Sequence, residues 1–383
     1  LLNITQICSL IERSQRPVLI LGAGVHIAQA EAQMRRFVDW LKVPILLTWG
    51  AKDLLPDDHP FLAGTFGVCG SSVGNFTVTS ADLVLSIGAR LNTQEVGRDW
   101  RRFAPVAKKI VLDSDIAELE KLGKATYKAH SDLRALPVLM CGHIQKRPNL
   151  DGWFTRIADW KARYPIRPDE HYKQGDGVNP YIFITELSEA AGDDDIIVTD
   201  TGATLVWVMQ TWRVKEGQRV FSSFNHSPMG YALPAAIGAA KVFPDRRIIC
   251  ITGDGGFQMN IQELATLKRH NLNVKVFVLD NQGYGIIRQT QDTWLDGRHV
   301  ASSSKKDLGR PDYVALAKAY GLGSSDVVDP LDLEFLLSDK EPSVHIICID
   351  PLARIIPKLG KAESIADMEP LLSREQLQAE LEC

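Results

Sequence analysis

The chain has 383 residues, of which 45% are hydrophobic and 23% charged, a composition typical of a globular protein with two or three domains. Its net charge is −4, and its lysines and arginines are scattered, which argues against a nucleic-acid partner. No apolar run reaches the roughly 18 residues that span a bilayer, so we expect no membrane segment. The cysteines form no CxxC pair, which favours free thiols and a cytoplasmic location.

The first part of the chain alternates strand-like and helix-like segments. This alternation predicts a parallel, Rossmann-like sheet in a domain over residues 1–145. A charged segment rich in Pro and Gly, residues 146–178, is interpreted as a linker. The expected strands are Pro17–Leu21, Val43–Leu47, Leu83–Gly88 and Ile110–Asp113.

A second domain is expected over residues 179–360, followed by a tail at 361–383 that either covers a site or forms a solvated helix. It has the same alternation, so the predicted fold class is α/β, with two doubly wound domains built on parallel sheets. Its expected strands are Ile196–Thr199, Ile248–Thr252, Val274–Leu279 and Val344–Ile349.

Two polar residues follow neighbouring strands of this second domain. Asp254 comes just after the run Ile248–Thr252, and Asn281 comes just after Val274–Leu279. We expect one helix, from Gln258 to His270, between them. A strand-helix-strand unit makes the two strands parallel, which places Asp254 and Asn281 on the carboxyl edge where open α/β sheets bind ligands.

The residue types at this edge suit a metal bound to a diphosphate. A carboxylate and an amide oxygen are hard donors that match Mg²⁺, with phosphate oxygens completing the octahedron. Gly253, Gly255 and Gly256 let the backbone approach a diphosphate closely. The Gly-Asp-Gly segment alone is equally compatible with an ordinary strand-to-helix turn, but Asn281 follows Asp254 by 281 − 254 = 27 positions, which favours the metal site.

This pattern resembles the thiamine diphosphate motif of the pyruvate decarboxylase and acetolactate synthase superfamily. The similarity continues through Asn260–Thr266 and Asn281–Gly285. It implies that Asp254, Asn281 and the main-chain carbonyl of Gly283 hold Mg²⁺, which binds the diphosphate of the cofactor. The cofactor-binding residues implied here are Gly253, Asp254, Gly255, Gly256, Asn281, Gly283 and Tyr284.

A second matching segment is Ser227–Ala240. In the family, the bulky residue of this turn wedges between the two thiamine rings and bends the cofactor, so that proton removal becomes intramolecular. The resemblance assigns this role to Met229 and places Ser227 against the cofactor. A methionine before glycine is by itself more often a core residue. His226, beside the turn, is either an acid or base toward a substrate carbonyl or a solvated loop histidine.

A third segment, Ile196–Thr204, matches a strand and turn that contact diphosphate oxygens in the family. The resemblance implies cofactor contacts at Gly202 and Thr204. Acetolactate synthases carry Gln-His where this chain has Ala203-Thr204, so only the Thr204 hydroxyl and backbone amides serve as donors.

The first domain offers weaker nucleotide signals. Gly22-Ala23-Gly24 follows a strand, but Ile27 stands where an NAD-binding fingerprint has its third glycine. The corresponding domain binds FAD in acetolactate synthases, so the resemblance allows either FAD or an empty domain here. The residues near the equivalent places are Gly22, Gly24, Thr48, Arg90, Asp113 and Asp132.

The sequence also departs from the family. Family members carry another N-terminal domain, whose glutamate activates the pyrimidine ring, and no Glu in this chain occupies a matching motif. We therefore assign no catalytic glutamate and expect this chain alone to catalyse poorly. Thr290 stands where acetolactate synthases carry a substrate-discriminating Trp, so their acceptor preference is not transferred.

The resemblance implies a thiamine diphosphate- and Mg²⁺-dependent lyase or transferase. The expected reaction is decarboxylation of a 2-oxo acid such as pyruvate, with carboligation of the remaining fragment to a second carbonyl. A simple decarboxylase, a non-catalytic cofactor-binding partner and an NAD-dependent oxidoreductase are the alternatives. The resemblance also implies a homodimer or homotetramer, with each site shared between subunits.

Overall fold

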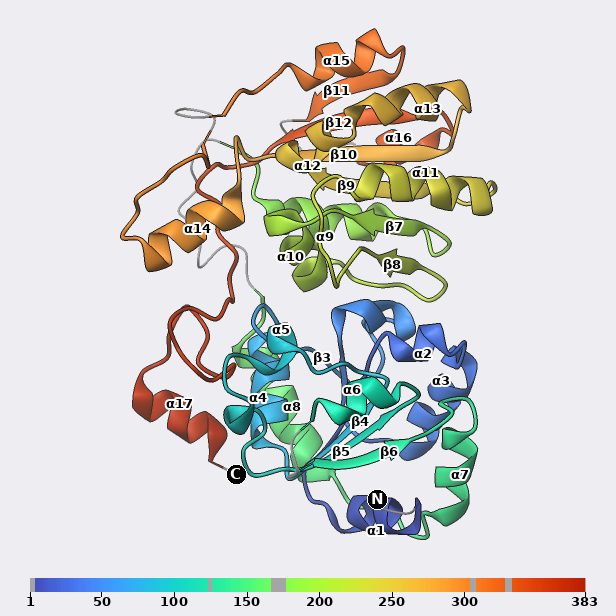
Figure 1. The fold of residues 1–383 in the computed structure, drawn as a ribbon, viewed down its shortest axis with the longest axis vertical. Coiled ribbons are helices and arrows are strands. Elements are labelled where there is room, and N and C mark those ends of the chain that lie inside the picture. Colours follow the sequence, from blue (N-terminus) through green and yellow to red (C-terminus); the bar gives the residue numbers. More distant parts are fainter. Residues whose placement is uncertain (1–3, 123–125, 167–176, 304–307, 328–332, 383) are drawn as a thin grey trace. The chain divides into compact units, whose positions relative to one another are not determined.

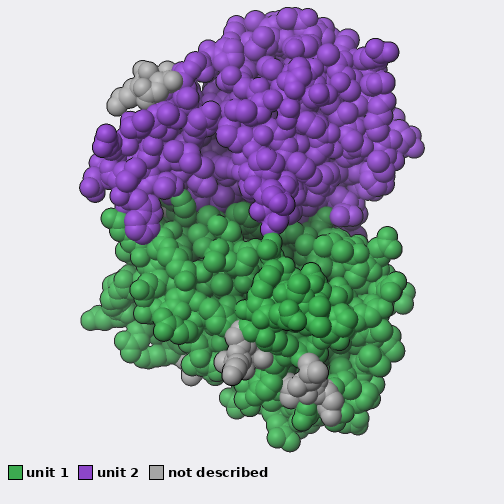
Figure 2. Space-filling model, viewed as in Figure 1, with its two compact units in different colours: residues 1–166, 356–383 green, residues 167–355 purple. Residues whose placement is uncertain are grey.

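The chain folds into two compact units. The computed structural model describes residues 4–122, 126–166, 177–303, 308–327 and 333–382. Unit 1 comprises Leu1–Ile166 together with Ile356–Cys383, and unit 2 comprises Arg167–Ile355 (Figure 1, Figure 2). Part of the predicted linker, residues 167–176, lies outside the described residues. Among the described residues, no helix has the length and apolar character needed to cross a membrane.

Unit 1 contains a six-stranded parallel sheet in the order β3-β2-β1-β4-β5-β6. β1 and β4 are buried along their whole length, as expected for strands covered on both faces. The strands are β1 (Pro17–Leu21), β2 (Ile45–Leu47), β3 (Leu62–Thr65), β4 (Leu83–Ile87), β5 (Lys108–Asp113) and β6 (Thr126–His130).

Helices pack against both faces of this sheet (Figure 1). The helix α8 belongs to unit 1, because Trp153 and Trp160 are buried in its core and the Trp153 indole donates to the Pro17 carbonyl at 3.1 Å. The α-helices of unit 1 are α1 (Ile4–Arg13), α2 (Gly24–Ile27), α3 (Glu31–Leu41), α4 (Ser72–Ser80), α5 (Thr93–Val96), α6 (Ile116–Glu120), α7 (Leu136–His143), α8 (Asp151–Arg163) and α17 (Arg374–Leu381). Two 3-10 turns, η1 (Trp49–Leu54) and η2 (Trp100–Arg102), complete it.

Unit 2 contains a second six-stranded parallel sheet, in the order β11-β12-β10-β9-β7-β8. The predicted α/β class with two doubly wound parallel sheets is therefore confirmed. The strands are β7 (Ile196–Thr199), β8 (Arg219–Phe221), β9 (Ile248–Gly253), β10 (Val274–Asp280), β11 (Gly323–Val327) and β12 (Ser343–Cys348).

Alternate side chains of β10 face the two helical layers of unit 2. Val276 and Val278 belong to a core cluster with α11, α13 and α15, whereas Phe277 packs against Phe183 of α9 with ring centroids 5.9 Å apart. The helices of unit 2 are α9 (Pro180–Ala190), α10 (Gly202–Thr211), α11 (Ala232–Val242), α12 (Asp254–Met259), η3 (Ile261–Glu263), α13 (Leu264–Arg269), α14 (Gly285–Trp294), α15 (Tyr313–Ala319) and α16 (Leu333–Ser338).

The segment between β9 and β10 corrects one prediction. A single helix from Gln258 to His270 was expected, but α12, η3 and α13 replace it. The break falls at Asn260, whose backbone angles (φ −135°, ψ 30°) are not helical and whose side chain donates to the Gly230 carbonyl at 2.8 Å. A tertiary hydrogen bond therefore overrides the local helical pattern.

The chain enters and leaves unit 2 through adjacent residues. Val178 forms a parallel bridge with Ile349, donating to the Cys348 carbonyl at 2.7 Å and accepting from the Asp350 amide at 3.1 Å. Gly177 has φ +146°, and a Cβ there would lie 2.5 Å from the Asp350 nitrogen. Glycine is thus required where the two segments meet.

The C-terminal helix α17 is held in unit 1 by a buried glutamate. Glu380 is 7% exposed and accepts hydrogen bonds from the Trp160 indole at 2.8 Å, the Arg163 guanidinium at 2.7 Å and the Tyr164 hydroxyl at 2.9 Å. Hydrogen bonding to Arg163 lowers the pKa of Glu380 from 4.5 to about 2.

We predict that Glu380→Gln lowers the free energy of unfolding by about 1–3 kcal/mol at neutral pH, because charge-assisted hydrogen bonds to Arg163 are lost. The pKa is lower in the folded state, so the stabilisation is complete above about pH 4.5 and disappears as the pH falls to about 2. Denaturant unfolding followed by tryptophan fluorescence measures both effects. Glu382→Gln, at an exposed position just after the same helix, is the control, and equal losses in both variants would contradict this account.

Candidate cofactor site

The carboxyl edge of the unit 2 sheet brings Asp254 and Gly283 into contact. β9 and β10 pair in parallel, with Gly253 opposite Leu279. The Asp254 carboxylate is buried; its Oδ1 accepts the Gly255 amide and its Oδ2 accepts the Gly283 amide, each at 2.8 Å. Each carboxylate oxygen accepts more than one bond, so both keep capacity for a cation.

Asn281 lies on the same edge. Its carboxamide is in a residue only 5% exposed, yet it forms no hydrogen bond with any described residue. Its main-chain carbonyl accepts from Arg288 at 2.9 Å. Neither carboxamide atom is among the fully buried side-chain atoms that lack a hydrogen-bond partner, so the amide keeps some accessible surface and can contact a ligand.

A second buried carboxylate raises the negative charge at this edge. Asp280 ends β10, accepts the Gln282 amide at 3.0 Å and pairs with Arg310, whose Nε lies 2.6 Å from Oδ2. Burial, and then the Asp280 charge, raise the pKa of Asp254 to about 7. No group of three or more His, Cys, Asp or Glu that could hold a metal occurs among the described residues. A cation here would therefore use amide and main-chain oxygens as well as a carboxylate.

Gly255 separates two large side chains at the site. A Cβ on Gly255 would lie 2.4 Å from Cε1 of Tyr284 and 3.1 Å from Cε of Met229. These three residues come from the segments after β9, after β10 and before α11. Met229 is 37% exposed, which leaves its side chain accessible to a ligand.

The segment after β7 completes the group. Gly202 begins α10 with φ +72°, and the buried Thr204 has its Oγ1 3.1 Å from the position of a Cβ on Gly253. The Thr201 and Ser227 hydroxyl oxygens lie 2.5 Å apart. The structure thus places the predicted residues of all three motifs along one sheet edge.

Two other residues have no such contacts. His226 is exposed, with Nδ1 3.5 Å from the Asn225 amide nitrogen, and no hydrogen bond joins it to the residues above. Thr290 is exposed on α14, and its hydroxyl donates to the Ile286 carbonyl at 2.8 Å. The roles assigned to them by resemblance stay predictions.

The sequence interpretation missed three polar residues at this edge: Asp200, Asp280 and Arg310. Asp200 follows β7 as Asp254 follows β9, so a polar residue after a buried strand was a usable signal. Asp280 was overlooked because its neighbour Asn281 was taken as the polar residue that follows the strand. Arg310 had no such signal, because its pairing with Asp280 spans 30 residues that form no local pattern.

A cavity of about 150 Å³ opens at the site. Asp254, Gly255, Gly283 and Tyr284 contribute to its wall, together with Gln258, Met259, Leu308, Gly309 and Arg310. Gly283 has φ +140°, and a Cβ on it would lie 2.4 Å from the Ser302 carbonyl oxygen. The donor set and this glycine-lined space fit a metal-bound diphosphate.

The candidate nucleotide-binding residues of unit 1 also follow the carboxyl ends of strands, but several of them contact neighbouring residues of the same unit. A Cβ on Gly22 would lie 2.3 Å from the Gly88 carbonyl oxygen, and the Gly24 amide donates to that carbonyl at 2.9 Å. Arg90 pairs with Glu118 at 3.4 Å. Packing of two strand-to-helix turns therefore explains these glycines without a nucleotide. Thr48, Asp113 and Asp132 follow or end β2, β5 and β6.

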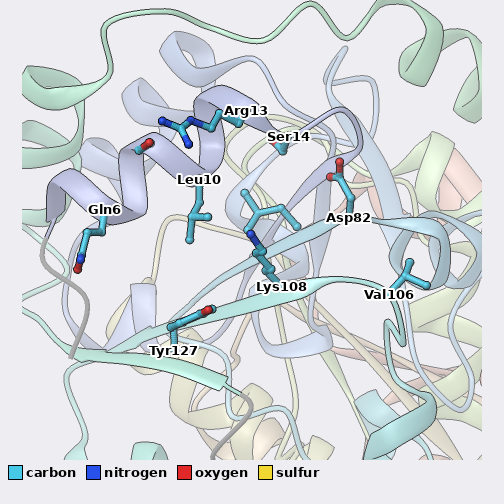
Figure 3. Close-up of a pocket in the computed structure, with 10 residues that line it drawn as sticks. Gln6, Leu10, Arg13, Ser14, Asp82, Val106, Lys108 and Tyr127 are labelled. Carbon is cyan, nitrogen blue, oxygen red and sulfur yellow. The ribbon is translucent and has the colours of Figure 1, made fainter.

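A larger cavity, about 560 Å³, lies at the opposite edge of the unit 1 sheet (Figure 3). Leu10 of α1 extends toward Tyr127 of β6, and Lys108 at the start of β5 also lines the space. This is the amino edge, whereas ligands of open α/β sheets bind at the carboxyl edge. We assign no cofactor to it.

Comparison with family models identifies both units. The model described as thiamine pyrophosphate enzyme, C-terminal TPP binding domain, matches residues 200–340, and the model described as thiamine pyrophosphate enzyme, central domain, matches residues 4–139. The chain belongs to the thiamine pyrophosphate enzyme family. The predicted resemblance is thereby confirmed, and unit 2 contains the domain of this family that binds the cofactor.

Individual relatives of this thiamine pyrophosphate enzyme are acetolactate synthase large subunits. The chain is 31% identical to the isozyme 2 large subunit of Escherichia coli K12 over 376 residues, covering 97% of this chain and 66% of that protein. It is 32% identical to the probable large subunit of Methanocaldococcus jannaschii, with 98% and 65% covered. It is 34% identical to the large subunit of Cyanidium caldarium, over 84% of this chain and 54% of that protein. The chain thus spans about two thirds, or less, of these relatives' length.

We predict that Gly255→Ala destabilises unit 2 by about 1–3 kcal/mol, because the new methyl group would overlap Tyr284. Gly238→Ala is the matched control: it lies in α11 with nothing within 4 Å of its Cβ position, so helix propensity should stabilise the protein by about 0.5–1 kcal/mol. Thermal unfolding of both variants checks this. A Gly255→Ala protein as stable as Gly238→Ala would mean that the contact is not tight.

Proposed function

We propose that unit 2 binds thiamine diphosphate through Mg²⁺ held by Asp254, Asn281 and the main-chain carbonyl of Gly283. The observation that carries this proposal is the contact between the buried Asp254 carboxylate and the Gly283 amide on the sheet edge where Asn281 follows β10. The two acidic side chains at the edge, of which Asp280 pairs with Arg310, favour a divalent cation.

The remaining site residues divide between the two halves of the cofactor. Gly202, Thr204, Gly253, Gly255 and Gly256 would lie along the diphosphate, where small residues and hydroxyls allow close approach. The exposed Met229, with Tyr284 and Ser227 beside it, would contact the rings.

The proposed reaction is decarboxylation of a 2-oxo acid such as pyruvate, with carboligation to a second carbonyl. When bound, thiamine diphosphate would supply a nucleophilic thiazolium carbon and a positively charged ring that can accept the electrons left when CO₂ departs. The exposed position of His226 leaves its imidazole free to meet a substrate carbonyl. Protonation instead of carboligation would make the protein a simple decarboxylase.

The relatives' names describe them as large subunits, which supports an oligomer for this chain too. We propose a homodimer or homotetramer with the site shared between subunits. Sedimentation of the purified protein measures this. FAD in unit 1 and Mg²⁺ in unit 2 are part of the proposal, and flavin absorbance with metal analysis of the purified protein tests both.

We predict that Asp254→Asn weakens binding of inorganic diphosphate with Mg²⁺ at least tenfold, because a charged metal ligand is lost and an amide N–H₂ faces the Gly255 or Gly283 amide. Isothermal titration calorimetry measures the affinity. Asp245→Asn, exposed on the loop before β9, should bind as the unchanged protein does. Equal affinity of the Asp254→Asn protein would refute the metal role.

The enzymatic role has a separate test. We predict that co-expression with the part of a relative that this chain does not match raises CO₂ release from pyruvate above that of the chain alone, and that Asp254→Asn abolishes the increase. Binding of the cofactor without any CO₂ release in the combined protein would instead support a non-catalytic cofactor-binding partner.

A further inference from the structure

Asp200 is a buried carboxylate that joins three chain segments. It follows β7 and is 1% exposed. Its Oδ1 accepts the Thr201 amide at 2.9 Å and the Gly230 amide at 3.0 Å. Its Oδ2 accepts the Ala232 amide at 3.1 Å and the Thr252 hydroxyl at 3.3 Å. The hydrogen bonds of the carboxylate therefore come from the segment after β7, from the turn before α11 with the first residue of that helix, and from β9.

No basic side chain among the described residues forms an ion pair with this carboxylate. The charge is held by hydrogen-bond donors alone, two of which are main-chain amides just after Met229. Each of these amides would lose a buried partner if the carboxylate were removed, so the turn depends on Asp200.

The turn that carries Met229 also has a backbone that needs support. Ser227 has φ +47° and Gly230 has φ +86°, so both lie in the left-handed region. Non-glycine residues hold such angles only where surrounding contacts fix them. The Thr201 hydroxyl contacts the Ser227 hydroxyl at 2.5 Å, and Asn260 donates to the Gly230 carbonyl at 2.8 Å. Asp200 fixes the amides on the other side of the same turn.

Met229 itself is not fixed by its own side chain. It is 37% exposed, and its three rotatable bonds allow many positions. Its Cε lies beside Gly255 and Tyr284 only because the turn places its backbone there.

We propose that Asp200 is a positioning residue for the ring half of the cofactor, because it fixes the turn that carries Met229. This inference rests on the proposed binding of thiamine diphosphate in unit 2. The Asp254 carboxylate accepts from Gly255 and Gly283 and not from the Met229 turn. Asp200 accepts two main-chain amides of that turn, and its other donors, Thr201 and Thr252, adjoin the diphosphate-side residues Gly202 and Gly253. We therefore expect loss of Asp200 to affect the ring half more than the diphosphate half.

Two probes separate the halves of the site. Inorganic diphosphate with Mg²⁺ tests only the metal and diphosphate residues, whereas thiamine diphosphate with Mg²⁺ also engages the ring contacts. Isothermal titration calorimetry of the full chain gives both affinities. Asp200→Asn keeps the size of the side chain but places an N–H₂ group against an amide N–H.

We expect Asp200→Asn to weaken thiamine diphosphate binding roughly tenfold, which corresponds to the loss of one or two hydrogen bonds, and to weaken inorganic diphosphate binding by a clearly smaller factor. In a Met229→Ala background the same substitution should have little further effect on thiamine diphosphate, because Asp200 acts through Met229. Hydrogen exchange at the Gly230 and Ala232 amides should become faster.

Asp195→Asn is the matched control. Asp195 is also buried, lies just before the same strand and accepts the Gly192 amide at 2.7 Å, but it is at the opposite edge of the sheet. Asp195→Asn should lower the thermal stability of the protein and leave unchanged the ratio of its affinities for thiamine diphosphate and inorganic diphosphate. If Asp200→Asn does not fold, Asp200→Ser, which keeps one hydrogen-bonding oxygen in a smaller side chain, replaces it.

Several outcomes would overturn the inference. One is that Asp200→Asn weakens the binding of thiamine diphosphate and of inorganic diphosphate equally. Another is that Asp200→Asn weakens thiamine diphosphate binding just as strongly in the Met229→Ala background. A third is that Asp195→Asn changes the ratio of the two affinities as much as Asp200→Asn does. Equal affinity of the unchanged chain for the two probes would also overturn it while leaving the diphosphate site standing. Failure of the unchanged chain to bind inorganic diphosphate would contradict the proposed function itself.

Discussion

Parallel pairing of β7, β9 and β10 is the constraint on which the rest of the site depends. Residues far apart in the sequence reach one edge because each follows a strand whose neighbours run in the same direction. Asp200 donates its main-chain amide to the Ile251 carbonyl, and Gly253 lies opposite Leu279. A shift of one residue in this register would turn these polar side chains away from the edge and into the helical layers.

The same edge concentrates negative charge in a buried place. Asp200, Asp254 and Asp280 are each at least nine-tenths buried, and each accepts main-chain amides. They differ in what else surrounds them. Asp200 has only hydrogen-bond donors, Asp280 has Arg310, and Asp254 lies beside the second carboxylate with its pKa raised. A cation bound at Asp254 would offset both the burial of this carboxylate and its repulsion by Asp280.

The inner strands of both sheets could be predicted from the sequence, whereas the edge strands could not. The eight expected strands are the inner strands of the two sheets, whose runs of apolar residues reflect burial on both faces. The four strands that were missed, β3, β6, β8 and β11, are the four edge strands. Segments such as Gly323–Val327 have no continuous apolar run, because an edge strand is partly solvated and is paired on one side only.

The same limit applies to the site. Asp254 and Asn281 could be predicted because each follows an inner strand. Arg310, Asn260 and the partners of Asp200 could not, because their contacts join segments whose proximity is set only by the folded sheet. The break at Asn260 shows the reason: a helical pattern in the sequence yielded to a hydrogen bond that Asn260 donates to a residue 30 positions away.

The bridge between Val178 and Ile349 makes unit 2 a self-contained insertion whose two ends meet. A segment with adjacent ends can be excised, produced separately or circularly permuted without stretching its backbone. The chain geometry therefore makes the diphosphate-binding half of this protein transferable as a single genetic cassette, while unit 1 is assembled from two pieces that flank it.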